Sequence, residues 1–266
     1  QEVTWSMMLK VVRPAKGRAG NRELHVYRSG LLDHLPGGLR APQCWGTTEH
    51  ADGEFWLWIE EIVEEIGDTW PLARFRLAAR HLGQFNGAYL SGQRSLPTFP
   101  WIGRKRARQG VEQWTATMMA QPDRTFSDPL VQELYPSDIF ADVMALWEKR
   151  ETWLKALESL PQTLCYMDAW RPNLFSRQGD DGQTETVAVD WPYISIGAVG
   201  EELAPLVWGG TKGISRLLNS TRWMPRFSPG IWMDYGMPTG AGPRAWCAWA
   251  LFYPRRCVMC SCIGIP

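Results

Sequence analysis

Two short apolar segments enclose a polar loop within residues 165–190, and this arrangement constrains the fold more than any other part of the sequence. The first segment leads to Asp168, and Asn173 follows five residues later. A Gly/Asp-rich turn then precedes the second segment, which ends at Asp190. An Asp-x4-Asn loop followed by a strand-terminal Asp is typical of phosphoryl-transfer sites. Because Asp and Asn are also common turn formers, two surface turns are the alternative interpretation.

The same stretch resembles the aminoglycoside phosphotransferase and choline kinase-like family. The catalytic loop of that family usually reads His-x-Asp-x4-Asn, and its second carboxylate usually lies in Ile-Asp-Trp. This chain has Tyr166-Met167-Asp168-x4-Asn173 and Val189-Asp190-Trp191, so Tyr166 replaces the usual His. The resemblance implies that Asp168 is the catalytic base and that Asn173 and Asp190 bind Mg²⁺, with ATP as the phosphate donor.

The resemblance also implies a fold. We expect an α+β, protein-kinase-like fold with two lobes: a partial small lobe of antiparallel strands and one helix, and a large, mainly helical lobe. The expected division is residues 1–62 for the partial small lobe and hinge, 63–206 for the catalytic lobe, and 207–266 for an atypical tail. The chain of 266 residues is long enough to bury a sizeable core.

Composition fits a soluble globular protein, with 45% hydrophobic and 21% charged residues. The formal net charge of zero gives no indication of a nucleic-acid or membrane partner. No apolar run is long enough for a transmembrane helix, and the N-terminus lacks a signal-peptide pattern. The six cysteines do not form a disulfide scaffold, so we expect thiols and a cytoplasmic location.

Lys10 lies between apolar residues in a predicted strand over residues 3–12. A buried lysine is costly unless it is paired, whereas an edge-strand lysine could point to water. The family resemblance implies that Lys10 contacts the nucleotide phosphates and pairs with Glu23. Glu23 lies in the first turn of a helix predicted over residues 22–35 and capped by Asn21, where the helix dipole alone would also favour an acid.

A short strand near residues 43–46 and an apolar strand over 55–59 precede an acidic segment. In the kinase-like fold this segment is the hinge, where backbone groups of Glu60, Glu61 and Ile62 would meet adenine. A solvated acidic turn is the alternative, and the two interpretations are compatible.

Helical periodicity is clearest over residues 70–90, where apolar residues recur every three or four positions. We expect a structural role for His81 beside this stripe. A second long helix is predicted over 137–160, capped by Ser137, and a third helix starts within 197–205. The predicted buried face of the second helix consists of Val143, Leu146, Trp147, Trp153, Leu154, Leu157 and Leu160.

The basic segment 104–108 could bind phosphate or nucleic acid, but we expect a solvated surface because no interleaved aromatic residues form a stacking platform. From residue 205 onwards Asp234 is the single acidic residue, and the periodicity expected of the acceptor-pocket helices is lost. We therefore hypothesise that this tail is out of frame or truncated relative to related chains. Zinc binding by Cys247, Cys257, Cys260 and Cys262 is a weaker alternative because the spacing is unfamiliar.

The start of the chain also departs from the family. A kinase-like small lobe places two strands and a glycine-rich turn before the lysine strand, yet nine residues precede Lys10, so we expect that turn to be missing. Two hypotheses follow. The first is an ATP-dependent kinase of a hydroxyl group on a small molecule. The second is a catalytically inactive, truncated or frameshifted relative that does not turn over.

Overall fold

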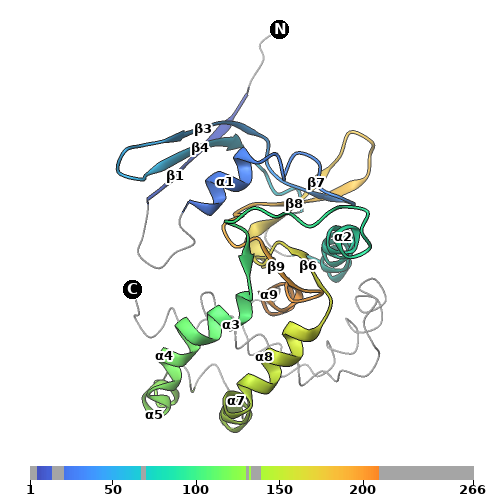
Figure 1. The fold of residues 1–266 in the computed structure, drawn as a ribbon. Helices are drawn as coiled ribbons and strands as arrows, with labels where there is room; N and C mark the ends of the chain where they lie inside the picture. Colours follow the sequence, from blue (N-terminus) through green and yellow to red (C-terminus); the bar gives the residue numbers. More distant parts are fainter. Residues whose placement is uncertain (1–4, 14–20, 67–69, 130–131, 133–138, 210–266) are drawn as a thin grey trace.

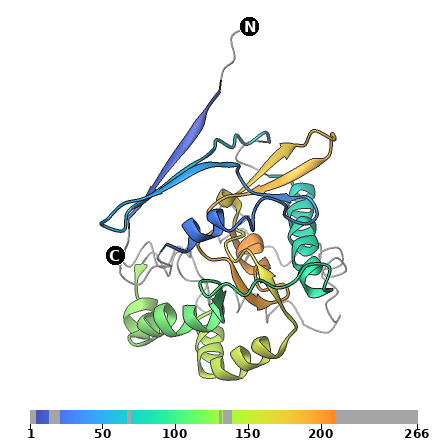
Figure 2. The same cartoon turned by 45° about the horizontal axis from the view of Figure 1, so that its top comes forward.

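The computed structural model describes residues 5–13, 21–66, 70–129, 132 and 139–209. Within them the chain forms three small three-stranded sheets and a set of mostly short helices. Figures 1 and 2 show one sheet with a short helix at one end of the molecule and most helices at the other. No helix in the described ranges is long and apolar enough to cross a membrane. Ser137 and all but the first three residues of the predicted tail, with its four cysteines, lie outside the described residues.

The first sheet confirms the strands predicted in the N-terminal part of the chain. Its members are β1 (Met7–Val12), β3 (Cys44–Glu49) and β4 (Phe55–Glu60), antiparallel in the order β1-β4-β3. Phe55, Leu57 and Ile59 are buried because alternate residues of β4 face the core. Lys10 lies on β1, an edge strand of this sheet, opposite Leu57 of β4. The Lys10 side chain is partly buried.

Helix α1 (Arg22–Arg28) is shorter than predicted, so the expectation of a helix reaching residue 35 is wrong. It ends because Gly30 adopts a left-handed conformation with φ 71°, and Ser29 donates its hydroxyl to the Val26 carbonyl. The Asn21 side chain makes no capping hydrogen bond, so that expectation is also wrong. Leu24 and Tyr27 are nevertheless buried, as are Glu23 and Val26.

Helix α2 (Leu72–Leu90) confirms the clearest helix of the sequence. It lies beside the hairpin of β7 (Leu174–Gln178) and β8 (Thr184–Ala188) in both views (Figures 1 and 2). The buried His81 contacts the Thr186 hydroxyl at 2.9 Å, and burial lowers the pKa of His81 to about 4. A neutral, buried and hydrogen-bonded imidazole in this position fits the structural role expected for His81.

Two further sheets contain the strands of the C-terminal half of the chain. One has the order β2-β8-β7 and the other β5-β9-β6. Their strands are β2 (Leu39–Arg40), β5 (Gly103–Arg104), β6 (Gln162–Cys165), β7 (Leu174–Gln178), β8 (Thr184–Ala188) and β9 (Ser195–Ala198). The Gly/Asp-rich turn joins β7 to β8, with Gly182 at φ 73°. The parallel pairing of β2 with β8 was not predicted, because two residues are too few to give a periodic signal.

Further helices in the described residues are α3 (Arg106–Gly110), the π-helical turn η1 (Val111–Thr115), α4 (Ala116–Met119), α5 (Pro122–Phe126), α7 (Ile139–Glu148), α8 (Arg150–Ser159) and α9 (Leu203–Gly209). The single long helix predicted over 137–160 is wrong, since the chain breaks at Lys149 into α7 and α8. Leu154 is buried as predicted, whereas Trp153 is 41% and Leu160 is 36% exposed.

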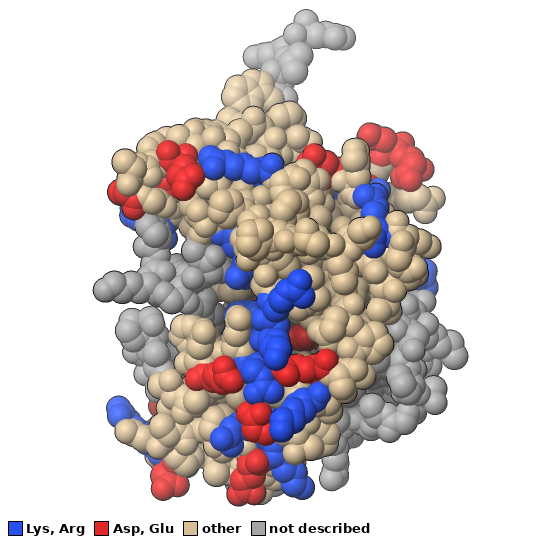
Figure 3. Space-filling model, in the orientation of Figure 1, with Lys and Arg blue, Asp and Glu red and all other residues tan. Residues whose placement is uncertain are grey.

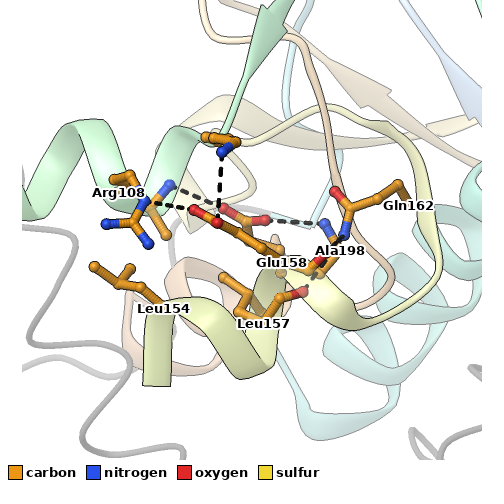
Figure 4. Close-up of a pocket in the computed structure, with 9 residues that line it drawn as sticks. Arg108, Leu154, Leu157, Glu158, Gln162 and Ala198 are labelled. Carbon is orange, nitrogen blue, oxygen red and sulfur yellow. Dashed lines mark hydrogen bonds and ion pairs between the residues drawn. The ribbon is translucent and has the colours of Figure 1, made fainter. Parts of the chain in front are cut away.

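In the basic segment 104–108, Arg104 and Lys105 are exposed as expected, while Lys105 and Arg108 also pair with acids. Arg108 binds Glu158 at 2.6 Å and Glu151 at 3.0 Å, and Lys105 lies 3.5 Å from Glu158. Lys105, Arg108 and Glu158 line a pocket between α3, α8 and β9 (Figure 4), and the buried Glu201 adds a further carboxylate to its lining. Acidic and basic side chains also alternate over the lower part of the face in Figure 3. The charges in this region therefore offset one another.

Candidate active site

Asp168 and Asn173 lie on a short loop between β6 and β7. The turn η2 (Arg171–Asn173) brings the Asn173 side chain back toward Asp168, and its Nδ2 donates to Asp168 Oδ2 at 2.7 Å. The same amide donates to the Asp168 carbonyl oxygen at 3.2 Å. Both side chains are almost fully buried. This contact fixes the orientation of the Asp168 carboxylate. Because Asn173 uses its amide nitrogen here, its side-chain oxygen Oδ1 is the atom that could bind a metal ion.

Asp190 follows β8 and adopts a left-handed backbone conformation with φ 62°. A non-glycine residue in this region is strained and persists where its surroundings hold it. The next residue is fixed, because the Trp191 backbone N–H donates to Glu23 Oε1 at 3.2 Å and the indole is fully buried. The Asp190 carboxylate itself is about one-third exposed, at 34%. The Asp190 carboxylate is therefore partly exposed, while the residue after it is held in place by its contacts.

Lys10 joins Asp190 to the N-terminal sheet. Its ammonium group lies 2.8 Å from Glu23 and also pairs with Asp190, so the ion pair expected between Lys10 and Glu23 is present. Burial lowers the pKa of Lys10, but attraction to Glu23 and Asp190 outweighs this effect and raises the pKa above its ordinary value. Lys10 is therefore held in its charged form.

Five of the predicted site residues thus form two contact groups. Lys10, Glu23 and Asp190 make one group, and Asp168 with Asn173 makes the other. Val189 connects them, since its N–H donates to the Asn173 carbonyl oxygen at 3.0 Å and its own carbonyl accepts the Tyr166 hydroxyl.

The predicted hinge residues lie at the end of β4 and in the segment after it. Glu60 uses its backbone N–H to bind the Gln43 carbonyl at 2.8 Å, and its carboxylate binds Arg177 at 2.8 Å. The Glu60 N–H is therefore already engaged in the sheet. Glu61 is exposed and Ile62 is half-buried, so backbone contacts to a nucleotide base remain a prediction for these two positions.

Glu202 holds the backbone of the loop that carries Asp168. It was not among the predicted site residues. One of its oxygens, Oε2, accepts the backbone N–H groups of Tyr166 and Met167, the latter at 3.1 Å. The other oxygen accepts Asn86 Nδ2 at 2.8 Å. Burial raises the pKa of Glu202 to about 7. An acid directly before the apolar Leu203 was the available sequence signal, but pattern alone does not reveal that it turns inward.

The donor set fits Mg²⁺ better than a soft or structural metal. A carboxylate from Asp190 and an amide oxygen from Asn173 are hard oxygen ligands, and Mg²⁺ commonly takes one or two such groups together with waters and phosphates. No cluster of three or more His, Cys, Asp or Glu side chains that could hold a metal ion occurs in the described part of the chain. A closed, all-protein metal site is therefore not formed by these residues.

The small antiparallel sheet with its lysine, the helix carrying the paired acid and the Asp-x4-Asn loop together describe a protein-kinase-like α+β fold. Comparison with solved structures confirms this fold, and the similar proteins are aminoglycoside phosphotransferases. APH(3'')-Id from Streptomyces rimosus, solved with ADP and streptomycin, has a TM-score of 0.53 at 17% identity, covering 93% of this chain and 85% of its own. APH(2")-IIIa, solved with GDP and kanamycin, has a TM-score of 0.55 at 11% identity, covering 95% and 84%.

A third similar structure is a thermostable mutant of APH(4)-Ia, with a TM-score of 0.53 at 16% identity over 97% of this chain and 80% of its own. No family model and no curated protein matches the sequence. At these identities the comparison establishes the fold, while activity and substrate have to be argued from the residues.

Proposed function

We propose that this protein is an ATP-dependent phosphotransferase that acts on a hydroxyl group of a small molecule. One observation carries the proposal: Lys10, Glu23 and Asp190, which are far apart in sequence, meet in one ion cluster that Val189 links to the Asp168–Asn173 pair. In this proposal the same residues supply the phosphate-binding, metal-binding and proton-accepting groups that phosphoryl transfer uses.

Each side chain has a separate role in this proposal. Asp168, oriented by Asn173, accepts the proton of the acceptor hydroxyl and aligns the oxygen for attack on the terminal phosphorus. Lys10, oriented by Glu23, binds phosphate oxygens of the nucleotide. Asn173 and Asp190 would hold Mg²⁺, which when bound neutralises charge on the phosphates. Positioning and charge neutralisation supply most of the rate in such reactions.

The hinge supplies the proposed binding site for the nucleotide base. Backbone groups in the segment of Glu60, Glu61 and Ile62 would contact adenine, and the Glu60 N–H would have to leave the Gln43 carbonyl to take part. Support for a nucleotide comes from two of the similar structures, APH(3'')-Id and APH(2")-IIIa, which were solved with ADP and GDP. We propose a cytoplasmic location, as the use of ATP requires.

The acceptor class follows from the same comparison. Two of the similar structures hold streptomycin or kanamycin, which makes polyhydroxylated amino sugars the first class to test. The experiment is transfer of labelled γ-phosphate from Mg-ATP to a panel of aminoglycosides, amino sugars, choline-like alcohols and simple polyols. We expect labelled product with at least one acceptor and none with the Asp168→Asn variant. Absence of product across the panel, or equal product from Asp168→Asn, contradicts the proposal.

A second candidate is a relative that binds nucleotide weakly or not at all and transfers no phosphate. It is favoured by the direct contact of Lys10 with Asp190, which occupies the carboxylate needed for metal, and by Tyr166 at the position of the usual His. Titration with Mg-ATP separates the candidates, because the active form requires Lys10 to exchange Asp190 for phosphate oxygens.

A further inference from the structure

Glu64 links the hinge to the catalytic loop through contacts that the acidic sequence does not reveal. Its carboxylate is 12% exposed and lies 3.2 Å from the Arg171 guanidinium, which belongs to the loop between Asp168 and Asn173. The same oxygen accepts the indole N–H of Trp70 at 3.0 Å. The other oxygen accepts the backbone N–H of Ser176 on β7 at 3.2 Å. One hinge carboxylate therefore connects the start of α2, the catalytic loop and β7.

Stacking strengthens the same connection. The Arg171 guanidinium carbon lies 4.4 Å from the centre of the Trp70 ring, and that of Arg74 lies 4.5 Å from it. Arg74 is anchored on the β7–β8 hairpin, where it donates to the Thr186 hydroxyl and to the Phe175 carbonyl, each at 2.9 Å. Cation–π contacts and charge-assisted hydrogen bonds are stronger when they are shielded from water, as they are in this cluster.

Arg171 also closes its own loop by donating to the Leu174 carbonyl at 3.2 Å. Its side chain therefore holds the turn that carries Asn173 and docks that turn onto Glu64 and Trp70. A displacement of Glu64 would pass directly to the loop that carries Asp168 and Asn173, because Arg171 of that loop contacts Glu64.

We infer that Glu64, Trp70 and Arg171 form a hinge strut: three positioning residues that set the catalytic loop relative to the hinge. The inference rests on the proposed function where it concerns nucleotide. If a nucleotide binds, the strut couples the presence of its base at the hinge to the position of Asn173, the proposed Mg²⁺ ligand. None of the three residues touches the reacting atoms.

The matched comparison is the ion pair between Glu60 and Arg177. It has the same chemistry, a separation of 2.8 Å and an origin in the same acidic segment, but it ends on β7 rather than on the catalytic loop. Its side chains are about one-third exposed, at 32% and 30%, so it is also more screened. Arg177→Met thus removes a hinge ion pair, together with the contact of Arg177 with Glu185 at 3.0 Å, and leaves Glu64, Trp70 and Arg171 unchanged.

Hydrogen–deuterium exchange of the ligand-free protein tests the strut without assuming any activity. In Arg171→Met and in the milder Glu64→Gln, we expect backbone amides of residues 166–174 to exchange about tenfold faster than in wild type. Arg177→Met should leave those amides unchanged. Equal exchange in Arg171→Met, Glu64→Gln and Arg177→Met overturns the inference. Glu64→Gln keeps the test decisive if Arg171→Met does not fold.

Binding of ADP tests the coupling. Arg171→Met should raise the Mg²⁺ concentration that half-saturates ADP binding by about five- to tenfold, and leave metal-free ADP affinity unchanged. Arg171→Lys, which keeps the charge, should recover part of the loss, and Arg177→Met should match wild type. An unchanged Mg²⁺ requirement in Arg171→Met overturns the coupling. If wild type itself binds no ADP, the proposed function fails, while the exchange experiment still decides whether the strut positions the loop.

Discussion

The Tyr166 hydroxyl donates a hydrogen bond to the carbonyl oxygen of Val189, the residue before Asp190. Tyr166 is fully buried, and its ring packs against Trp191 with 4.6 Å between ring centres. The residue that departs from the usual His therefore still connects the loop of Asp168 to the strand end that carries Asp190. This contact holds the backbone just before the left-handed Asp190.

Tyr166→Phe should lower the free energy of unfolding and loosen Asp190. The substitution keeps the ring but leaves the Val189 carbonyl without this donor, so we expect a loss of about 1–3 kcal/mol. Urea denaturation measures the loss. A gain in ADP affinity on adding Mg²⁺ that is smaller than in wild type would report the movement of Asp190.

Tyr27→Phe is the matched control. The Tyr27 hydroxyl is also buried, but it has no hydrogen-bond partner among the described residues. Removing it should leave stability unchanged or slightly higher, because an unsatisfied buried hydroxyl costs free energy. Equal losses in Tyr166→Phe and Tyr27→Phe would show that the contact with Val189 contributes nothing.

Glu202 should make stability depend on pH. Burial raises its pKa from 4.5 to about 7, so between these values the folded state binds more protons than the unfolded state. Its contribution to stability is therefore most favourable below about pH 4.5 and falls as the pH rises through about 7. Glu202→Gln cannot ionise, so its unfolding free energy relative to wild type should rise by roughly 2–3 kcal/mol between about pH 5 and pH 8.

Glu158→Gln provides the contrast for this pH series. Hydrogen bonding to Arg108 lowers the pKa of Glu158 below its ordinary value, so this carboxylate stays ionised throughout the same pH range. Its stability difference from wild type should be flat between about pH 5 and pH 8. A flat profile for Glu202→Gln as well would show that Glu202 does not titrate in this window.

Asp168→Asn should separate binding from chemistry. An Asn side chain can still accept the hydrogen bond from Asn173 Nδ2, so the loop geometry and Mg-nucleotide affinity should be retained. It cannot take the acceptor proton, and kcat should fall by about 100- to 10,000-fold. Steady-state kinetics with any acceptor found in the screen, together with calorimetry, measures both quantities. Near-full turnover would remove Asp168 from the role of base.

Lys10→Met should affect nucleotide binding and stability by different routes. It removes the phosphate-binding charge and also leaves the buried Glu23 without its cation, which destabilises a folded protein by about 1–3 kcal/mol. The double variant Lys10→Met/Glu23→Gln should regain much of the stability but none of the nucleotide affinity. Thermal denaturation and ADP titration distinguish the two effects. Recovery of nucleotide affinity in the double variant would argue against contact between Lys10 and phosphate.

The sequence predicted the parts of this molecule that are encoded locally. Asp168 and Asn173 share one short loop, and the stripe of α2 repeats at helical spacing, so the sequence alone is enough to place both. The pairing of Lys10 with Glu23 was predicted from family resemblance, since nothing in the intervening sequence requires it.

The contacts that were missed are long-range or depend on a single backbone conformation. The contact between Glu64 and Arg171 joins segments more than 100 residues apart, and Glu64 looked like part of a solvated acidic run. Likewise, the early end of α1 depends on the left-handed Gly30, and the break at Lys149 interrupts an apolar pattern that would support one helix. Periodicity reports which residues prefer burial, but not where the chain turns.

Isothermal titration of the full chain with Mg-ATP tests the central claim most directly. The cluster of Lys10, Glu23 and Asp190 beside Asp168 and Asn173 predicts saturable binding that requires Mg²⁺ and is lost in Lys10→Met/Glu23→Gln, the variant expected to retain its fold. No heat at millimolar Mg-ATP from folded wild-type protein, or equal binding by the double variant, would contradict a nucleotide-dependent phosphotransferase built on these residues.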